Sequence, residues 1–221
     1  MQRIGILGGT FNPPHLGHLA LARHARLQLD LDHVLLMPAN HAPNKPAVKD
    51  DPGPEHRLRM CRLAVAEESG VETSALEIER GGTSYTVVTV QAIHDSYPDA
   101  ELTLIVGADT ALTLPGWREP ARLLEMTARV AVAQRDGSDL GEIKAALDPL
   151  LASSERGAEP GQHLITLRMT PVAISSSLVR RRVLAGEPVV ELVGDRVSDY
   201  IAKHGLYRTQ SPATSVGGGA A

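Results

Sequence analysis

Short apolar runs of strand length alternate with stretches of helical periodicity along most of the chain. The candidate strands span residues 3–7, 33–38, 72–78, 101–106, 129–133 and 164–168. The helical patterns lie between and after them, over residues 17–29, 54–68, 84–96, 176–185 and 190–204. Strands that alternate with helices in this way form a parallel sheet covered by helices on both faces. The pattern therefore predicts an α/β fold.

The chain carries no internal repeat and no interdomain linker, so residues 1–208 are expected to form a single domain of Rossmann-like, doubly wound architecture. Residues at the boundaries support the predicted helices, because Pro54 suits the first turn of a helix and Gly205 is typical of a position where a helix ends. Residues 136–161, an amphipathic segment over residues 140–151 followed by a polar loop, are expected to be a surface insertion. Residues 209–221 lack apolar periodicity and are expected to be a disordered tail.

Composition excludes several classes of protein. A net charge of −4 and a pI near 6.1 show no basic excess, which argues against a nucleic-acid partner. No apolar run approaches the roughly 18 residues of a membrane span. Glycines interrupt the N-terminal apolar run, so we expect no signal peptide, a cytoplasmic protein and no membrane partner. The single cysteine, Cys61, excludes an intramolecular disulfide and is expected to be a small buried apolar residue.

The segment GGTFNPPHLGH, residues 8–18, directly follows the first candidate strand. Ligands of parallel sheets bind beyond the carboxyl ends of the strands, and a glycine turn before a helix exposes N–H groups to phosphate. Gly8 and Gly9 permit close backbone approach, and Thr10 offers a hydroxyl. His15 and His18 share one face if both lie at a helix start. The segment predicts a phosphate site that is neither a P-loop nor a dinucleotide fingerprint.

Two plainer interpretations of this segment stay open. One is a tight turn followed by structural or solvated histidines. The other is half of a metal site, for which the sequence places no third ligand nearby.

A second candidate site is ISSSLVRRR, residues 174–182, which follows a strand and opens a helix. Serines at a helix N-terminus offer hydrogen-bond donors where the helix dipole favours anions. Arg180 lies about one turn inside the helix and can reach back to the same place. Taken alone, the segment is equally well explained as a capped helix with surface charge.

Together the two segments resemble the nucleotidyltransferases that carry an HxGH motif and a late ISSTxxR motif. Further segments resemble bacterial nicotinate-nucleotide adenylyltransferases, and the likeness extends from residue 4 to residue 208. These segments are MPANHAPNKP (37–46), TSYTVVTV (83–90), GADTALTLPGWRE (107–119) and VSDYIAKHGLYR (197–208).

The resemblance implies transfer of the AMP moiety of ATP to nicotinic acid mononucleotide, giving nicotinic acid adenine dinucleotide and pyrophosphate. It implies direct in-line displacement, with Mg²⁺ arriving on ATP as the only cofactor and no dedicated metal site. No Ser-His-Asp or Cys-His signature points to a covalent intermediate, and such transfer depends on positioning and charge stabilisation. A homo-oligomer is left open.

The resemblance also implies roles for individual residues on the ATP side. His15 and His18 would hold the phosphates and stabilise the pentacoordinate phosphorus, with Arg180 as the third catalytic residue. The remaining ATP-binding residues would be Gly8, Gly9, Thr10 and Phe11 after the first strand, Gly107 and Asp109 in the nucleotide cleft, and Ser175 and Ser176 beside the leaving phosphates.

Acceptor recognition is expected to involve a different set of residues. Trp117, the only tryptophan, lies beside a Pro-Gly pair in a predicted loop and suits stacking on the pyridine ring, with a packing role as the alternative. Tyr85 and Thr86 match the family segment whose amides receive the nicotinate carboxylate, although ordinary capping would explain them too. Asn40 and Lys45 would complete the acceptor-binding residues.

Three positions depart from the family pattern. Asn12 stands where the family commonly has Asp, Val88 replaces the usual Asp of the SYTxDT segment, and Ser177 replaces Thr.

Two other functions are alternatives to the transfer of AMP to nicotinic acid mononucleotide. The first is a related adenylyltransferase that uses nicotinamide mononucleotide or another phosphate acceptor. The second is a nucleotide-binding sensor without turnover, which the intact His15, His18 and Arg180 disfavour.

Overall fold

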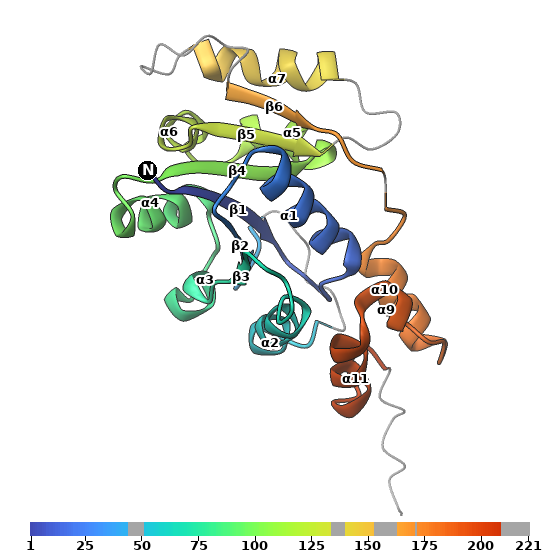
Figure 1. Ribbon diagram of the computed structural model, residues 1–221. Helices are drawn as coiled ribbons and strands as arrows, with labels where there is room; N and C mark the ends of the chain where they lie inside the picture. The colour runs from blue at the N-terminus through green and yellow to red at the C-terminus, as the bar shows by residue number, and fades with distance from the viewer. Residues whose placement is uncertain (44–50, 134–139, 153–162, 171, 209–221) are drawn as a thin grey trace, which may run out of the picture.

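Six parallel strands form the centre of the molecule, in the order β3-β2-β1-β4-β5-β6. The computed structural model in Figure 1 describes residues 1–43, 51–133, 140–152, 163–170 and 172–208. The strands are β1 (Arg3–Gly9), β2 (His33–Pro38), β3 (Val71–Thr73), β4 (Glu101–Gly107), β5 (Arg129–Ala133) and β6 (Leu164–Leu167). The predicted doubly wound parallel sheet is confirmed.

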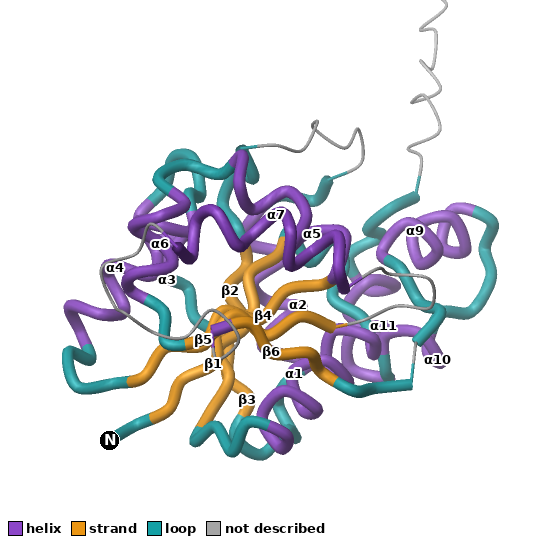
Figure 2. Tube along the Cα trace, turned by 90° about the horizontal axis from the view of Figure 1, so that it is seen from above, coloured by secondary structure: helices purple, strands orange, loops and turns teal. Residues whose placement is uncertain are grey.

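Helices cover both faces of the sheet. They are α1 (Leu16–Gln28), α2 (Pro54–Ala64), α3 (Leu76–Arg80), α4 (Thr86–Ser96), α5 (Ala108–Thr113), the 3-10 turn η1 (Leu114–Gly116), α6 (Pro120–Met126), α7 (Leu140–Ala152), α9 (Ser176–Leu184), α10 (Val190–Val193) and α11 (Asp195–Lys203). Figure 2 shows α4, α6 and α7 on one side of the strands and α1 on the other. Within the described residues, no helix is both long and apolar enough to cross a membrane.

The central strands read as continuous apolar runs because both of their faces are buried. In β4, Leu102, Leu104 and Val106 pack with α4, α6 and α7, while Ile105 joins the opposite cluster around α1. Leu19, Ala22 and Ala25 form the buried stripe of α1, at the spacing expected for one helical face.

The strand order reverses between β1 and β4, and this reversal positions the candidate site. From β1 the chain crosses to β2 and β3, whereas β4 lies on the other side of β1 and leads to β5 and β6. Ligands of open α/β sheets bind beyond the carboxyl ends of the strands at such a switch point. Gly8 and Gly9 end β1 and Gly107 ends β4 at this edge.

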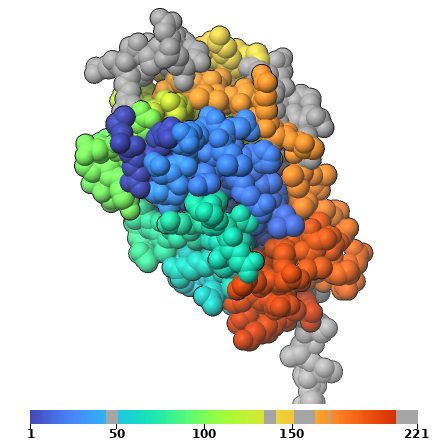
Figure 3. All heavy atoms as spheres, in the orientation of Figure 1, coloured from blue at the N-terminus to red at the C-terminus, as the bar shows by residue number. Residues whose placement is uncertain are grey.

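The C-terminal helices α9, α10 and α11 pack together beside α1 and α2. Their apolar cluster includes Val179, Leu192, Val197 and Ile201, and Met60 of α2 belongs to it. Figure 3 shows this orange and red segment lying against the blue N-terminal segment and the cyan α2. The packing brings the start of α9 to the end of β1, although the two are far apart in sequence.

Two elements predicted to be continuous are each divided in two in the structure. Residues 72–78 were predicted to be one strand, but β3 ends at Thr73 and α3 follows, because the Ser74 hydroxyl accepts the Leu76 N–H and starts a turn. Residues 190–204 were predicted to be one helix, but Gly194 adopts a positive φ of 81° and separates α10 from α11. Such a φ is favourable for glycine and ends the first helix.

The described part of the segment expected to be a surface insertion, residues 140–152, is a helix that covers the sheet. Ile143 and Leu147 of α7 are each 1% exposed and belong to the main core cluster. These residues lie four positions apart and so share the face that packs against α5 and α6. The expectation of an insertion was therefore wrong for residues 140–152. The predicted tail, residues 209–221, lies outside the described residues.

Candidate active site

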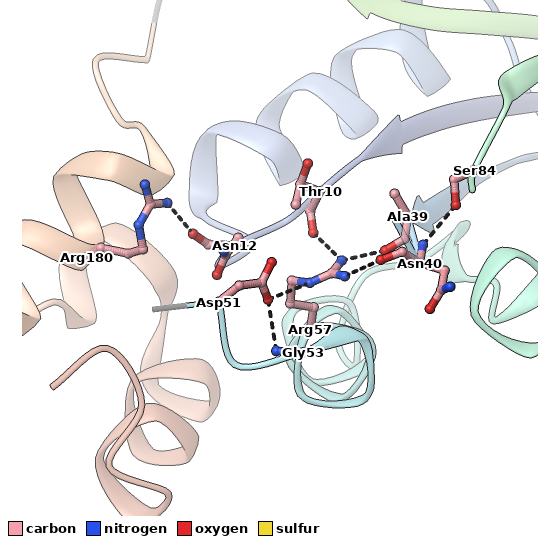
Figure 4. Close-up of polar contacts among 9 residues, drawn as sticks. All are labelled: Thr10, Asn12, Ala39, Asn40, Asp51, Gly53, Arg57, Ser84 and Arg180. Carbon is pink, nitrogen blue, oxygen red and sulfur yellow. Dashed lines mark hydrogen bonds and ion pairs between the residues drawn. The ribbon is translucent and has the colours of Figure 1, made fainter. Parts of the chain in front are cut away.

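The two predicted phosphate-binding segments meet at the carboxyl edge of the sheet. Arg180 Nη1 donates to the Asn12 carbonyl at 2.7 Å, a contact drawn in Figure 4. The Ser176 hydroxyl donates to the Pro13 carbonyl at 2.8 Å. Ser175 caps α9, since its hydroxyl accepts the Leu178 N–H at 3.1 Å. The late motif thus fixes the loop after β1 through main-chain carbonyls.

His15 and His18 lie together at the N-terminus of α1. His15 is the N-cap residue, and its N–H donates to Nδ1 of His18 at 3.2 Å. The two rings stack with centroids 3.7 Å apart. Because Nδ1 of His18 accepts a main-chain N–H, the neutral ring carries its proton on Nε2. A helix N-terminus with such a donor favours an anionic ligand.

The glycines before this helix differ from the prediction in their conformation. We expected Gly8 and Gly9 to form a turn, but both belong to β1, and the left-handed residue of the loop is Phe11, with φ of 49°. Phe11 is buried, and the edge of its ring lies against His18 with centroids 4.8 Å apart. A Cβ built on Gly8 meets nothing within 4 Å. The end of β1 at Gly8 therefore leaves open space.

The same loop holds polar atoms that the fold does not use. The Thr10 hydroxyl and both polar side-chain atoms of Asn12 are buried, with no hydrogen-bond partner among the described residues. Leaving such groups unpaired costs about 1–3 kcal/mol each. The loop thus has hydrogen-bonding capacity beyond what its own structure needs. Across the described part of the chain, no group of three or more His, Cys, Asp or Glu side chains could hold a metal ion.

Gly107 and Asp109 lie at the neighbouring strand end. Gly107 is the last residue of β4 and the N-cap of α5, and the exposed Asp109 is in the first turn of that helix. Since β4 pairs with β1, this turn and the loop after β1 line the same edge of the sheet.

The predicted acceptor residues Asn40, Tyr85 and Thr86 are also brought together. The Asn40 N–H donates to the Ser84 hydroxyl at 2.9 Å, and its side-chain amide donates to the Gly82 carbonyl at 2.8 Å. Tyr85 is the N-cap of α4 and Thr86 its first residue. The loop after β2 therefore lies against a helix N-terminus, which suits a carboxylate or a phosphate.

Trp117 follows η1 and is half-buried. Its Nε1 donates to the Thr113 hydroxyl at 3.1 Å, and part of its ring packs against the core, as does Tyr85. The Arg118 guanidinium lies 4.8 Å from the centroid of the Tyr85 ring, in cation–π contact. The Trp117 loop is thus joined to the start of α4. Lys45 falls within residues 44–50, outside the described part of the chain.

Two buried charged residues that the sequence did not indicate hold residues of the candidate site or their neighbours. Arg57 of α2 donates to the carbonyls of Thr10, Ala39 and Asn40 and is 2% exposed. Helical spacing does place Arg57 on the same face as Met60 and Cys61, which was a usable signal of burial.

The second residue is Glu77 of α3, which accepts from the Thr89 hydroxyl at 2.5 Å and is hydrogen-bonded by Ser84. Burial raises the pKa of Glu77, although these hydroxyls and Arg80 oppose that shift. Glu77 therefore anchors residues on both sides of Tyr85 and Thr86.

Comparisons with known proteins agree with this geometry. The cytidylyltransferase-like family model matches residues 6–182. A probable nicotinate-nucleotide adenylyltransferase of Roseiflexus sp. (strain RS-1) is 45% identical over 205 residues, which covers 93% of this chain and 98% of that protein. A relative of the same description from Gemmatimonas aurantiaca is 40% identical and covers 94% of this chain and 93% of its own length.

Solved structures share the fold. A Plasmodium falciparum nicotinic acid mononucleotide adenylyltransferase complexed with NaAD superposes with a TM-score of 0.71 at 16% identity, covering 94% of this chain and 98% of that one. At this level of identity, the likeness concerns the fold alone.

Proposed function

The chain belongs to the cytidylyltransferase-like family and, within it, to the nicotinate-nucleotide adenylyltransferases, and on this premise we propose how its residues transfer AMP from ATP to nicotinic acid mononucleotide. A phosphate oxygen of the mononucleotide attacks the α-phosphorus of ATP. The bond from that phosphorus to the bridging oxygen breaks, and pyrophosphate leaves. The product is nicotinic acid adenine dinucleotide. No residue forms a covalent bond with the substrate in this scheme.

His18 is assigned to the charge that develops on the α-phosphoryl oxygens. The support is its place at the N-terminus of α1 and the main-chain N–H that holds its proton on Nε2. His15, stacked on His18, completes the pair. A donor that is already oriented before reaction stabilises the transition state without a reorganisation cost. Both histidines are therefore proposed as catalytic residues.

The remaining ATP contacts are proposed for the loop after β1 and for two neighbouring segments, the turn after β4 and the start of α9. The open space at Gly8 supports passage of the triphosphate over the end of β1, beside Gly9, Thr10 and Phe11. On the β4 side, Gly107 and Asp109 would face the nucleoside, with the Asp109 carboxylate positioned for a ribose hydroxyl.

Ser175, Ser176 and Arg180 are proposed to hold the leaving β- and γ-phosphates. The hydroxyls of both serines already serve the fold, as a helix cap and as a donor to Pro13. Their main-chain N–H groups at the start of α9, together with the Arg180 charge, are thus the groups assigned to the phosphates. Mg²⁺ is proposed to enter as part of the MgATP substrate, since Mg²⁺ commonly stays on substrate phosphates.

Acceptor binding is proposed for the surface between β2, α4 and the Trp117 loop. Trp117 would stack on the pyridine ring, and the main-chain N–H groups of Tyr85 and Thr86 would receive the nicotinate carboxylate. Asn40 and Lys45 would contact the rest of the mononucleotide. The cation–π contact between Arg118 and the Tyr85 ring supports a single acceptor surface.

The observation that carries this proposal is the meeting of the two motifs, in which Arg180 and Ser176 hold the loop that leads to His15. The test is pyrophosphate release from MgATP with a panel of acceptors. Nicotinic acid mononucleotide should give the highest kcat/KM, above nicotinamide mononucleotide and phosphopantetheine. A different best acceptor would contradict the acceptor assignment, and ATP binding without turnover on any of them would favour a sensor.

A further inference from the structure

The guanidinium of Arg57 is buried between the loops after β1 and β2. Nη1 donates to the Thr10 carbonyl at 2.8 Å and to the Ala39 carbonyl at 2.6 Å, and Nη2 donates to the Asn40 carbonyl at 2.9 Å. In Figure 4 the side chain points from α2 toward all three. We define residues 9–13 as the ATP loop and residues 39–41 as the acceptor loop. One side chain therefore holds the main chain of both loops.

Each of the two loops connects its contact with Arg57 to a proposed substrate site. In the ATP loop, the next held carbonyl is that of Asn12, which Arg180 contacts. In the acceptor loop, the Asn40 N–H leads to Ser84, next to Tyr85. Hydrogen bonds and the main chain of the two loops thus connect α9 to the residue before the N-cap of α4, and Arg57 is the link at the middle.

We propose that Arg57 is a positioning residue that sets the distance between bound ATP and bound acceptor. This inference rests on the proposed function of the two loops. In-line transfer requires the acceptor oxygen and the α-phosphorus to be in near-attack geometry, and a displacement of about 1 Å can lower a rate by about 100-fold. Arg57 touches neither substrate in this account. Its effect on the reaction passes entirely through the carbonyls that it holds.

A lysine at position 57 cannot reproduce these three contacts. The guanidinium is a rigid planar fork with donors on separate nitrogens, whereas an ammonium concentrates its donors on one atom. The three carbonyls come from two loops and are contacted by two different nitrogens of Arg57. An Arg57→Lys variant would keep the positive charge but release at least one loop.

The charge of Arg57 is balanced on the other side of the guanidinium. Asp51 accepts from Nε at 3.2 Å, and the same carboxylate oxygen accepts the Gly53 N–H. Asp51 is 30% exposed, in contrast to the buried carbonyl contacts. An Asp51→Asn variant therefore weakens the ion pair and leaves the carbonyl contacts in place. The two variants separate charge balance from positioning.

The test compares Arg57→Lys and Asp51→Asn with Arg59→Lys as the matched control, because Arg59 is exposed on the same helix. For each enzyme, kcat and both KM values are measured well below its Tm, and calorimetric titration with ATP counts the competent sites. Arg57→Lys should lose about tenfold or more in kcat per competent site, while each KM stays within about threefold. Asp51→Asn should lower Tm and retain kcat.

Three outcomes would overturn the inference. The first is wild-type kcat per competent site in Arg57→Lys. The second is an equal kcat loss in Asp51→Asn, which would assign the effect to the buried charge. The third is a loss that lies entirely in one KM. Arg57→Gln serves as a second variant if Arg57→Lys does not fold, with the same expected kcat loss. A wild-type enzyme without turnover would instead contradict the proposed function itself.

Discussion

The guanidinium of Arg180 donates a 2.7 Å hydrogen bond to the main-chain carbonyl of Asn12, across 168 residues of sequence. This contact joins α9 to the loop that leads into α1, and Ser176 at the start of α9 contacts the same loop at Pro13. Both helices thereby direct their N-termini, with exposed N–H groups and positive dipole ends, toward one region. A triphosphate carries negative charge along its whole length, so a site built from two such ends suits it.

Replacement of Arg180 by lysine should impair turnover far more than folding. The variant keeps the charge but loses the fork that holds the Asn12 carbonyl and faces the proposed phosphates, so kcat should fall by about 100-fold. Steady-state kinetics with MgATP check this. Arg181, exposed on the same helix, provides the control variant Arg181→Lys, which should retain wild-type turnover. Equal losses of kcat in the two variants would contradict the assignment of Arg180 to the ATP site.

A methyl group at Gly8 tests the assigned path of the triphosphate. The φ of Gly8 is not in the left-handed region, and a Cβ there meets nothing within 4 Å, so Gly8→Ala should fold with an unchanged Tm. The methyl would project into the space proposed for ATP and raise the KM for ATP. Gly8→Val should raise it further. An unchanged KM in both variants would show that ATP does not pass over the end of β1.

Truncation of Trp117 should affect the acceptor alone. Aromatic stacking on a base is worth about 1–3 kcal/mol, so Trp117→Ala should raise the KM for nicotinic acid mononucleotide by about tenfold or more, with little change in the KM for ATP. Trp117→Phe keeps a ring and should recover most of the affinity. If both KM values rise together, or if phenylalanine gives no recovery, Trp117 is a packing residue.

Glu77 should make stability fall as pH rises above the ordinary carboxylate range. Burial raises its pKa above the ordinary value of 4.5, so the folded state binds the proton more tightly than the unfolded state does. The corresponding contribution is present below the unfolded pKa and is lost as pH rises through the folded pKa. Glu77→Gln lacks this titration. The Tm difference, variant minus wild type, should therefore grow between pH 4.5 and neutrality, and a pH-independent difference would contradict the shift.

The sequence was sufficient to predict where the two motifs would meet. The motif after β1 was expected at the carboxyl edge of the parallel sheet, and the family resemblance, which assigns both motifs to the phosphates of ATP, predicted that the late motif would lie there too. Strand-length apolar runs also located β2 and β5 with correct bounds. These predictions succeeded because both faces of the sheet are buried, which leaves long apolar runs in the sequence.

The sequence was not sufficient to find the link between the two substrate loops. Helical spacing indicates that Arg57 is buried, but its carbonyl partners lie up to 47 residues away, in loops without periodicity. Glu77 was hidden for a related reason, since residues 72–78 were read as a strand. In the structure this carboxylate lies on α3 and pairs with hydroxyls of α4 and of the turn before it.

The most direct test of this account is the turnover of His18 variants. His18→Ala should lower kcat by at least about 100-fold, the scale of one lost transition-state donor. The variant also loses the acceptor for the His15 N–H, so His18→Asn is the matched control, because its amide oxygen can replace Nδ1 but no group replaces Nε2. Both variants are expected to fold and to lose turnover to a similar extent. Near-normal kcat in His18→Asn would contradict the role of Nε2 in adenylyl transfer.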